Sequence, residues 1–245
     1  MKIIFWDYDG TLVDTEIWYK KIIVSFLKRI DVFLKDDISD EYFYKFISGK
    51  HNEDFVDKMK KDGYIKCDAF FDPSDLKKYY TKFIKELRVG DMQVIDNIDK
   101  TIEKLSKEDD IIMCITSSSF IHDFEIKSHS ANSEILNKLF KINENIYLCG
   151  NIENCKFKPA PDVYLYALND IKNKYNLHLT KNDKLFVVED SNAGCTAAMS
   201  FKNQVKDLNI KVVRFISNPL INTKDGEQTD FIAKTSAELY EILKN

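Results

Sequence analysis

The sequence predicts an α/β fold, a mainly parallel sheet flanked by helices, that is interrupted by an all-helical segment. Short apolar runs without polar alternation recur along the chain, which is typical of parallel strands covered on both faces. Amphipathic helical patterns separate these runs, and strands that alternate with helices indicate a parallel sheet. The interruption follows from residues 15–90, which contain helical patterns and no convincing buried strand.

Four apolar runs are the predicted strands of the sheet. In chain order they are KIIFW (2–6), IIMCIT (111–116), LFVV (185–188) and IKVVRFI (210–216). The carboxyl ends of parallel strands share one edge, and in open α/β sheets ligands bind outside that edge. The residues that follow these runs are therefore the first candidates for a functional site.

Three amphipathic segments are the predicted helices of the same α/β region: residues 97–107, 161–175 and 235–244. The last begins with a capping-box pattern, because Thr235 is followed three residues later by Glu238. Together with the strands, these helices assign residues 1–14 and 91–245 to one α/β domain.

The inserted segment, residues 15–90, is predicted to be an all-helical domain. Its helical patterns span residues 16–30, 40–47, 52–61 and 74–87. Ser74 is the expected N-cap of the last of these helices. Aromatic side chains repeat at helical spacing within the segment, which indicates a buried core of its own rather than a ligand-binding box.

Composition excludes several classes of protein. The 245 residues are 44% hydrophobic and carry a net charge of −4, whereas nucleic-acid-binding proteins usually have a basic excess. The five cysteines form no Cys-x-x-Cys pair, so we expect neither a disulfide framework nor a zinc site. No apolar run approaches the ~18 residues of a membrane span, and the first residues do not match a signal peptide. We expect a cytoplasmic protein, a monomer or weak dimer, that binds neither nucleic acid nor membrane.

Polar residues that can carry chemistry follow three of the predicted strands, and a lysine, Lys158, precedes a predicted helix. The polar residues are Asp7 and Asp9, then Thr116 and Ser117, then Glu189 and Asp190. Two aspartates at the mouth of a buried strand raise each other's pKa unless a cation joins them. Each stretch alone has a simpler interpretation as a turn, a helix cap or a surface charge. An EF-hand loop is excluded, because Leu12 and Trp18 stand where that loop needs Gly and Glu.

Taken together, these stretches resemble the four motifs of the haloacid dehalogenase superfamily of phosphotransferases. DYDGTLVDTE resembles the first motif, Thr116 after IIMCI the second, Lys158 in KPAPDVYLYA the third, and FVVEDSNAGCTAA the fourth. The resemblance implies a Rossmann-like core. The helical segment after the first motif resembles the cap domain of one branch of this superfamily. That branch includes β-phosphoglucomutase and many sugar-phosphate and phosphoglycolate phosphatases. The resemblance implies that the cap closes over the site and excludes water.

The resemblance implies a role for each acidic residue. Asp7 is the nucleophile that forms an aspartyl-phosphate, and Asp9 is the general acid that later acts as base. Mg²⁺ is the implied cofactor, with the carboxylates of Asp7, Glu189 and Asp190 and the backbone carbonyl of Asp9 as its ligands. Oxygen-only ligation suits this ion.

The remaining motif residues are implied phosphate ligands. Thr116 and Ser117 offer hydroxyl and backbone donors at a helix start, and Lys158 offers a compact positive charge. In related caps, residues in the position of Lys50 and His51 often contact substrate, although exposed polar side chains are the alternative interpretation for both.

The expected function is therefore a magnesium-dependent phosphatase that acts on a small phosphorylated metabolite, such as a sugar phosphate. A phosphomutase that uses the same aspartyl-phosphate is the alternative. β-Phosphoglucomutase carries a histidine shortly after its first motif, and this chain has Trp18 and Tyr19 there, which disfavours the mutase. A non-catalytic protein that binds a phosphorylated metabolite is the third possibility, and the complete set of motif residues argues against it.

Overall fold

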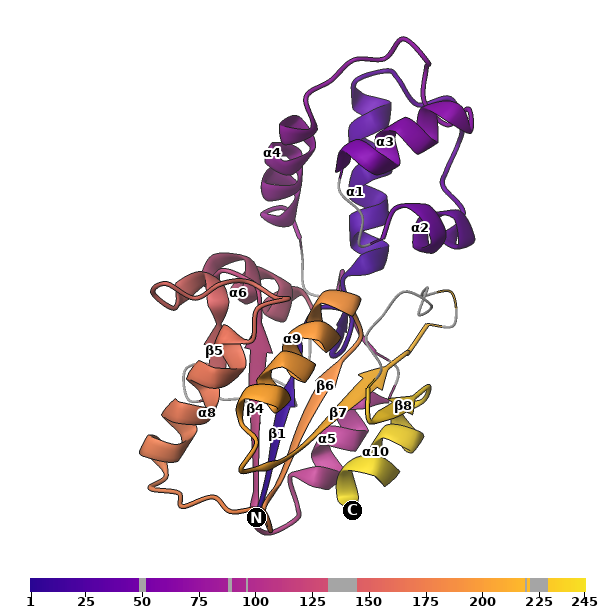
Figure 1. Ribbon diagram of the computed structural model, residues 1–245. Coiled ribbons are helices and arrows are strands. Elements are labelled where there is room, and N and C mark those ends of the chain that lie inside the picture. Colours follow the sequence, from indigo (N-terminus) through magenta and orange to yellow (C-terminus); the bar gives the residue numbers. More distant parts are fainter. Residues whose placement is uncertain (49–51, 88–89, 96, 132–144, 219, 221–228) are drawn as a thin grey trace. The chain divides into compact units, whose positions relative to one another are not determined.

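The computed structural model describes residues 1–48, 52–87, 90–95, 97–131, 145–218, 220 and 229–245. The chain divides into two compact units (Figure 1). The larger unit comprises Met1–Asp14, Val89–Pro219 and Thr223–Asn245, and the smaller comprises Thr15–Arg88 and Leu220–Asn222. That the smaller unit is an independent domain stays a prediction.

A six-stranded parallel sheet forms the centre of the larger unit, which confirms the predicted fold class (Figure 1). Its strand order is β5-β4-β1-β6-β7-β8. The strands are β5 (Ile146–Leu148), β4 (Ile111–Ser117), β1 (Lys2–Trp6), β6 (Lys184–Glu189), β7 (Asn209–Phe215) and β8 (Phe231–Ala233). Trp6 of the central strand β1 is paired with Ile115 of β4 and with Val188 of β6. The carboxyl ends of these three strands therefore lie side by side.

The four predicted strands are β1, β4, β6 and β7, and the two edge strands are additional. β5 and β8 have three residues each, which is too short for an apolar run to stand out from its surroundings. A further antiparallel pair joins β2 (Val13–Asp14) to β3 (Gln93–Val94). These two short strands precede and follow residues 15–92 in the sequence.

Helices cover both faces of the sheet (Figure 1). One face carries α8 (Asp162–Lys174) and α9 (Asn192–Gln204), and the other carries α5 (Ile98–Leu105) and α10 (Ser236–Lys244). Under α8 and α9, the rings of Phe5, Tyr164 and Phe201 pack together in a fully buried cluster. Helix α6 (Ile121–Ser130) follows β4. The predicted cap of α10 is present, because Thr235 Oγ1 accepts from the backbone N–H of Glu238.

The smaller unit contains α1 (Glu16–Arg29), α2 (Asp40–Phe46), α3 (Asn52–Lys61) and α4 (Pro73–Ile84). Its described residues contain no strand beyond a single bridge between Phe33 and Ile65, and aromatic residues fill its core. The prediction of Ser74 as an N-cap is wrong. Asp72 is the N-cap, and its carboxylate accepts from the Ser74 N–H at 2.7 Å. Pro73 takes the first helical position, where its fixed φ and missing N–H cost nothing.

Among the described residues, no helix has the length and apolar character that a membrane span requires.

Candidate active site

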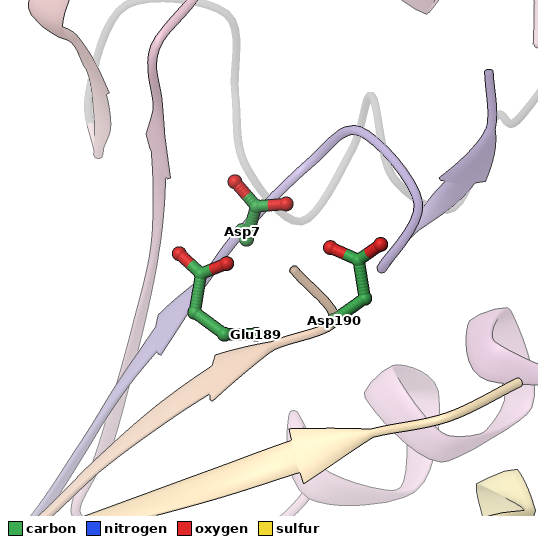
Figure 2. A group of neighbouring side chains, drawn as sticks. All are labelled: Asp7, Glu189 and Asp190. Carbon is green, nitrogen blue, oxygen red and sulfur yellow. The ribbon is translucent and has the colours of Figure 1, made fainter. Parts of the chain in front are cut away.

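Three carboxylates meet at the carboxyl ends of β1 and β6 (Figure 2). Asp7 follows β1, Glu189 ends β6, and Asp190 follows it. One oxygen of each carboxylate lies within 4.8 Å of the others, and all three residues are buried. The parallel register of β1 and β6 brings these acids together from positions far apart in the sequence.

Lys158 brings a positive charge into this cluster. Its Nζ donates to Asp7 Oδ1 and to Glu189 Oε1, both at 2.6 Å, and to the carbonyl oxygen of Thr116 at 3.0 Å. Burial alone would lower the pKa of Lys158, but the charges of Asp7 and Glu189 raise it well above its usual value. The lysine therefore stays an ammonium ion, and it links the ends of β1, β4 and β6.

One lysine does not balance three buried acids. Burial, and then the negative charge of Glu189, raises the pKa of Asp7 to about 7, although Lys158 acts in the opposite direction. A carboxylate in such surroundings is stabilised in its ionised form only when a further positive charge is added.

The donor set fits a magnesium ion. Three carboxylates provide the hard oxygen ligands that Mg²⁺ prefers. Glu189 Oε2 is buried and has no hydrogen-bond partner among the described residues, whereas its Oε1 is bound by Lys158 and Tyr164. An unsatisfied buried carboxylate oxygen is costly. A cation bound between these acids would remove that cost.

Two glycines make room for the carboxylates. A Cβ atom at Gly10 would lie 2.2 Å from Asp190 Oδ2, and one at Gly194 would lie 1.8 Å from Glu189 Oε2. Gly10 also has a φ of +82°, which other residues rarely adopt. The glycines of the first and fourth motifs are therefore part of the site, since any side chain at either position would displace a carboxylate.

Asp9 is paired with a different cation. Lys127 Nζ donates to Asp9 Oδ1 at 2.6 Å and to Oδ2 at 2.7 Å. The hydroxyl of Ser119 donates to Asp9 Oδ2 at 3.0 Å and accepts from Lys127 at 2.8 Å. The Asp9 carboxylate is thus outside the cluster of three acids and is held by groups from the β4–α6 connection and from α6.

Sequence reasoning missed Lys127 and Tyr164. Lys127 is only 4% exposed, and its spacing of three residues from the buried Phe124 on α6 placed it on the inner face of that helix. That spacing was only a weak signal, because a lysine on an amphipathic helix is normally exposed. Tyr164 lies on α8, is fully buried, and donates its hydroxyl to Glu189 Oε1. Burial raises the pKa of Tyr164 well above its usual value, so the phenol keeps its proton.

The two predicted hydroxyl ligands of phosphate are engaged with the protein itself. Thr116 Oγ1 donates to the Trp6 carbonyl at 3.4 Å, and Ser117 Oγ accepts from the Ser119 N–H at 3.0 Å. Their role toward phosphate stays a prediction. Lys50 and His51 lie outside the described residues.

Comparison with known proteins gives a family and a set of similar folds. The sequence profile of the haloacid dehalogenase-like hydrolases matches residues 3–205. No curated protein matches the chain.

Three similar solved structures illustrate the fold, and each is less than 20% identical to this chain. A conserved haloacid dehalogenase-like protein of unknown function from Agrobacterium tumefaciens has a TM-score of 0.69 and 18% identity, over 99% of this chain and 97% of its own. A protein from Thermotoga maritima assigned as a β-phosphoglucomutase has a TM-score of 0.63 and 18% identity, over 100% and 99%. A predicted phosphoglycolate phosphatase from Haemophilus somnus has a TM-score of 0.62 and 19% identity, over 99% and 97%.

Proposed function

This chain belongs to the haloacid dehalogenase-like hydrolase family, and on that premise we propose that it is a magnesium-dependent phosphatase of a small phosphorylated metabolite such as a sugar phosphate. One observation carries the proposal. The carboxylates of Asp7, Glu189 and Asp190 gather at one edge of the sheet, with Lys158 bonded to two of them. A buried nucleophile beside a fixed cation and a metal-binding set of acids supports phosphoryl transfer through an aspartyl-phosphate.

Asp7 performs the first step in this proposal. A carboxylate oxygen of Asp7 attacks phosphorus, the bond from phosphorus to the ester oxygen breaks, and the phosphoryl group remains on Asp7 as an acyl phosphate. Lys158 already lies 2.6 Å from Asp7 Oδ1, so its charge faces the phosphoryl oxygens without a large movement. When bound by Asp7, Glu189 and Asp190, Mg²⁺ offsets the repulsion between the anionic nucleophile and the anionic phosphate.

Asp9 moves the protons in this proposal. Its carboxyl group gives a proton to the leaving oxygen, and the resulting carboxylate then takes a proton from the water that attacks the acyl phosphate. Lys127 and Ser119 hold the Asp9 carboxylate in one orientation through three hydrogen bonds of 2.6, 2.7 and 3.0 Å. A fixed orientation is what a proton-transfer group needs, because the transfer occurs only within hydrogen-bond reach.

The proposal is tested by assay of the purified protein with Mg²⁺ on p-nitrophenyl phosphate and on a panel of phosphorylated metabolites. We expect release of inorganic phosphate that depends on Mg²⁺ and is lost in Asp7→Asn. Turnover no faster than that of Asp7→Asn on every compound would contradict the proposal.

The same panel separates a phosphatase from a phosphomutase, which the resemblance to β-phosphoglucomutase keeps as the alternative. A mutase would interconvert hexose phosphate isomers and release little free phosphate. We expect free phosphate to dominate with every sugar phosphate that is consumed. Tight binding of a metabolite with no turnover would instead support a non-catalytic binding protein.

A further inference from the structure

A pair of cysteines lies in the loop that leads to Lys158. Cys149 begins the short 3₁₀ helix η1 (Cys149–Asn151), directly after β5, and Cys155 follows in the next turn. Their Sγ atoms are 2.8 Å apart. All five cysteines of the chain are thiols, and no other two of them share a hydrogen bond among the described residues.

The backbone holds these two thiols together. The N–H of Ile152 donates to the carbonyl of Cys149, and the N–H of Cys155 donates to the carbonyl of Ile152, both at 3.2 Å. Two successive turns therefore bring the ends of the segment 149–155 to the same place. The path of the chain brings the two residues together, and their side chains then place the sulfurs 2.8 Å apart.

The two thiols differ in access. Cys149 is 2% exposed, whereas Cys155 is half-buried. Burial raises the pKa of Cys149 to about 12 and raises that of Cys155 as well. A thiol reacts as its thiolate, so both cysteines react slowly at neutral pH. An external reagent reaches Cys155 first, because Cys155 is the more exposed of the two.

We propose that Cys149 and Cys155 are a site of reversible disulfide formation, driven by exchange with a low-molecular-weight disulfide such as glutathione disulfide, and that the bond changes the placement of Lys158. Disulfides in reducing compartments are usually transient and redox-sensing rather than structural. Strained or accessible disulfides belong to the labile class, and Cys155 is the more accessible of the two thiols.

The exchange balances in two steps. The thiolate of Cys155 attacks one sulfur of glutathione disulfide, which forms a mixed disulfide on Cys155 and releases one glutathione. The thiolate of Cys149 then attacks the Cys155 sulfur, which closes the protein disulfide and releases the second glutathione. The two protons lost by the cysteines are taken up by the two glutathione thiolates, and the protein pair is oxidised by two electrons while glutathione disulfide is reduced.

The bond acts on the site through a short stretch of chain. A disulfide has an S–S distance of about 2.05 Å, so the sulfurs must approach by about 0.8 Å from their present 2.8 Å. Only two residues separate Cys155 from Lys158, and the first of them is fixed, because the Lys156 N–H donates to Asp162 Oδ2 at 3.0 Å. Lys158 holds Asp7 and Glu189 by two contacts of 2.6 Å. We expect closure of the disulfide to pass part of this movement along the chain to Lys158 and turnover to fall by about tenfold or more, since a misplacement of about 1 Å at a catalytic group costs about 100-fold.

The formation of the disulfide is tested on the full chain by incubation in glutathione buffers of increasing oxidised fraction, followed by acid quench and mass spectrometry of the peptides. We expect a peptide pair joined through Cys149 and Cys155 that dithiothreitol separates. In Cys149→Ser we expect a stable glutathione adduct on Cys155, because the resolving thiol is missing. In Cys155→Ser we expect no adduct on Cys149. The exposed Cys67 serves as the matched control, and Cys67→Ser should leave the disulfide unchanged.

Two results would overturn the proposal. The first is a wild type that carries glutathione on Cys67 but forms no disulfide, together with a Cys149→Ser variant that carries no glutathione on Cys155. The second is a fully formed disulfide with unchanged turnover of p-nitrophenyl phosphate, since that would remove the effect on Lys158. This effect on turnover rests on the proposed phosphatase function, whereas the disulfide itself does not. A reduced protein without phosphatase activity would therefore count against the proposed function alone, and in that case mass spectrometry still decides whether the disulfide forms.

Discussion

Asp7 and Asp9 stand two residues apart and are held by different positive charges. Asp7 belongs to a buried group of three carboxylates at the ends of β1 and β6, and Lys158 bonds to two of them, Asp7 and Glu189. The Asp9 carboxylate is bound by Lys127 of α6 and by Ser119. The two aspartates therefore have separate counter-charges, although Lys158 alone leaves the pKa of Asp7 raised to about 7. The difference also separates their proposed chemistry, because environments that treat two carboxylates differently suit one to attack and the other to proton transfer.

The largest expected effect distinguishes the two aspartates directly. Asp7→Asn removes the nucleophile, and we expect kcat for p-nitrophenyl phosphate to fall by about 10⁴-fold or more. In Asp9→Asn the first transfer from this substrate should remain fast, because p-nitrophenolate leaves without a proton, so a rapid-quench assay should show a burst of about one p-nitrophenolate per active site. The turnover that follows should be slow, because hydrolysis of the acyl phosphate has lost its base. Asp7→Asn should show no burst, and a burst missing from Asp9→Asn would contradict the proposed division of roles.

A second prediction concerns the lysine that the sequence did not reveal. Lys127→Met removes both contacts to Asp9, and we expect kcat on a sugar phosphate to fall by about 10- to 100-fold. The rate of the first release of p-nitrophenolate from p-nitrophenyl phosphate should fall several times less, since that leaving group needs no proton from Asp9. Lys127→Arg keeps the charge and should recover part of the activity. If both substrates lose activity in proportion to the loss of folded protein, then Lys127 has a structural role only.

A third prediction compares two glycines that share a positive φ. Gly10 has a φ of +82° and Gly63 a φ of +72°, but only a Cβ at Gly10 meets another group, namely Asp190 Oδ2 at 2.2 Å. Gly63→Ala should therefore cost only the backbone strain of about 1–2 kcal/mol. Gly10→Ala should cost a further ~1–3 kcal/mol of unfolding free energy for the displaced carboxylate. It should also weaken Mg²⁺ binding, which Gly63→Ala should not. Both free energies are measured by urea unfolding, and equal costs at the two positions would refute the crowding at Asp190.

A further prediction concerns the pH dependence of stability in the absence of metal. The pKa of Asp7 is raised from its usual 3.8 to about 7, so at intermediate pH the folded state holds a proton that the unfolded chain has released. The stability that comes from this proton is fully present below pH 3.8 and is lost as the pH rises to about 7. In EDTA, wild-type stability should therefore decline over this range. Asp7→Asn should decline less in the same urea titrations, and identical slopes would argue against a raised pKa.

The sequence alone predicted the long strands and the acidic residues at their ends. The four long strands were recognisable because parallel strands buried on both faces are continuously apolar, and the acids that follow them were placed by the rule that strand ends share an edge. The edge strands β5 and β8 were too short to recognise. Lys127 could not be assigned from its residue type, because a lysine on an amphipathic helix is normally exposed. Only the packing of α6 shows that it is buried against Asp9.

The pairing of Cys149 with Cys155 was also beyond the sequence. A spacing of six residues fits no common metal or disulfide motif, and the two turns that close the segment depend on backbone hydrogen bonds at Ile152. Gly10 is visible in the sequence as part of the first motif, but its proximity to Asp190 joins the ends of β1 and β6 and is visible only in three dimensions.

The most direct test of the account is calorimetric titration of Mg²⁺ into the wild type, Asp190→Asn and Asp9→Asn. We expect the wild type to bind one ion. Asp190→Asn should bind Mg²⁺ at least about tenfold more weakly, because a carboxylate ligand is lost. Asp9→Asn should keep nearly the affinity of the wild type, because the Asp9 carboxylate is held by Lys127. Equal weakening in both variants, or no binding by the wild type, would contradict the account.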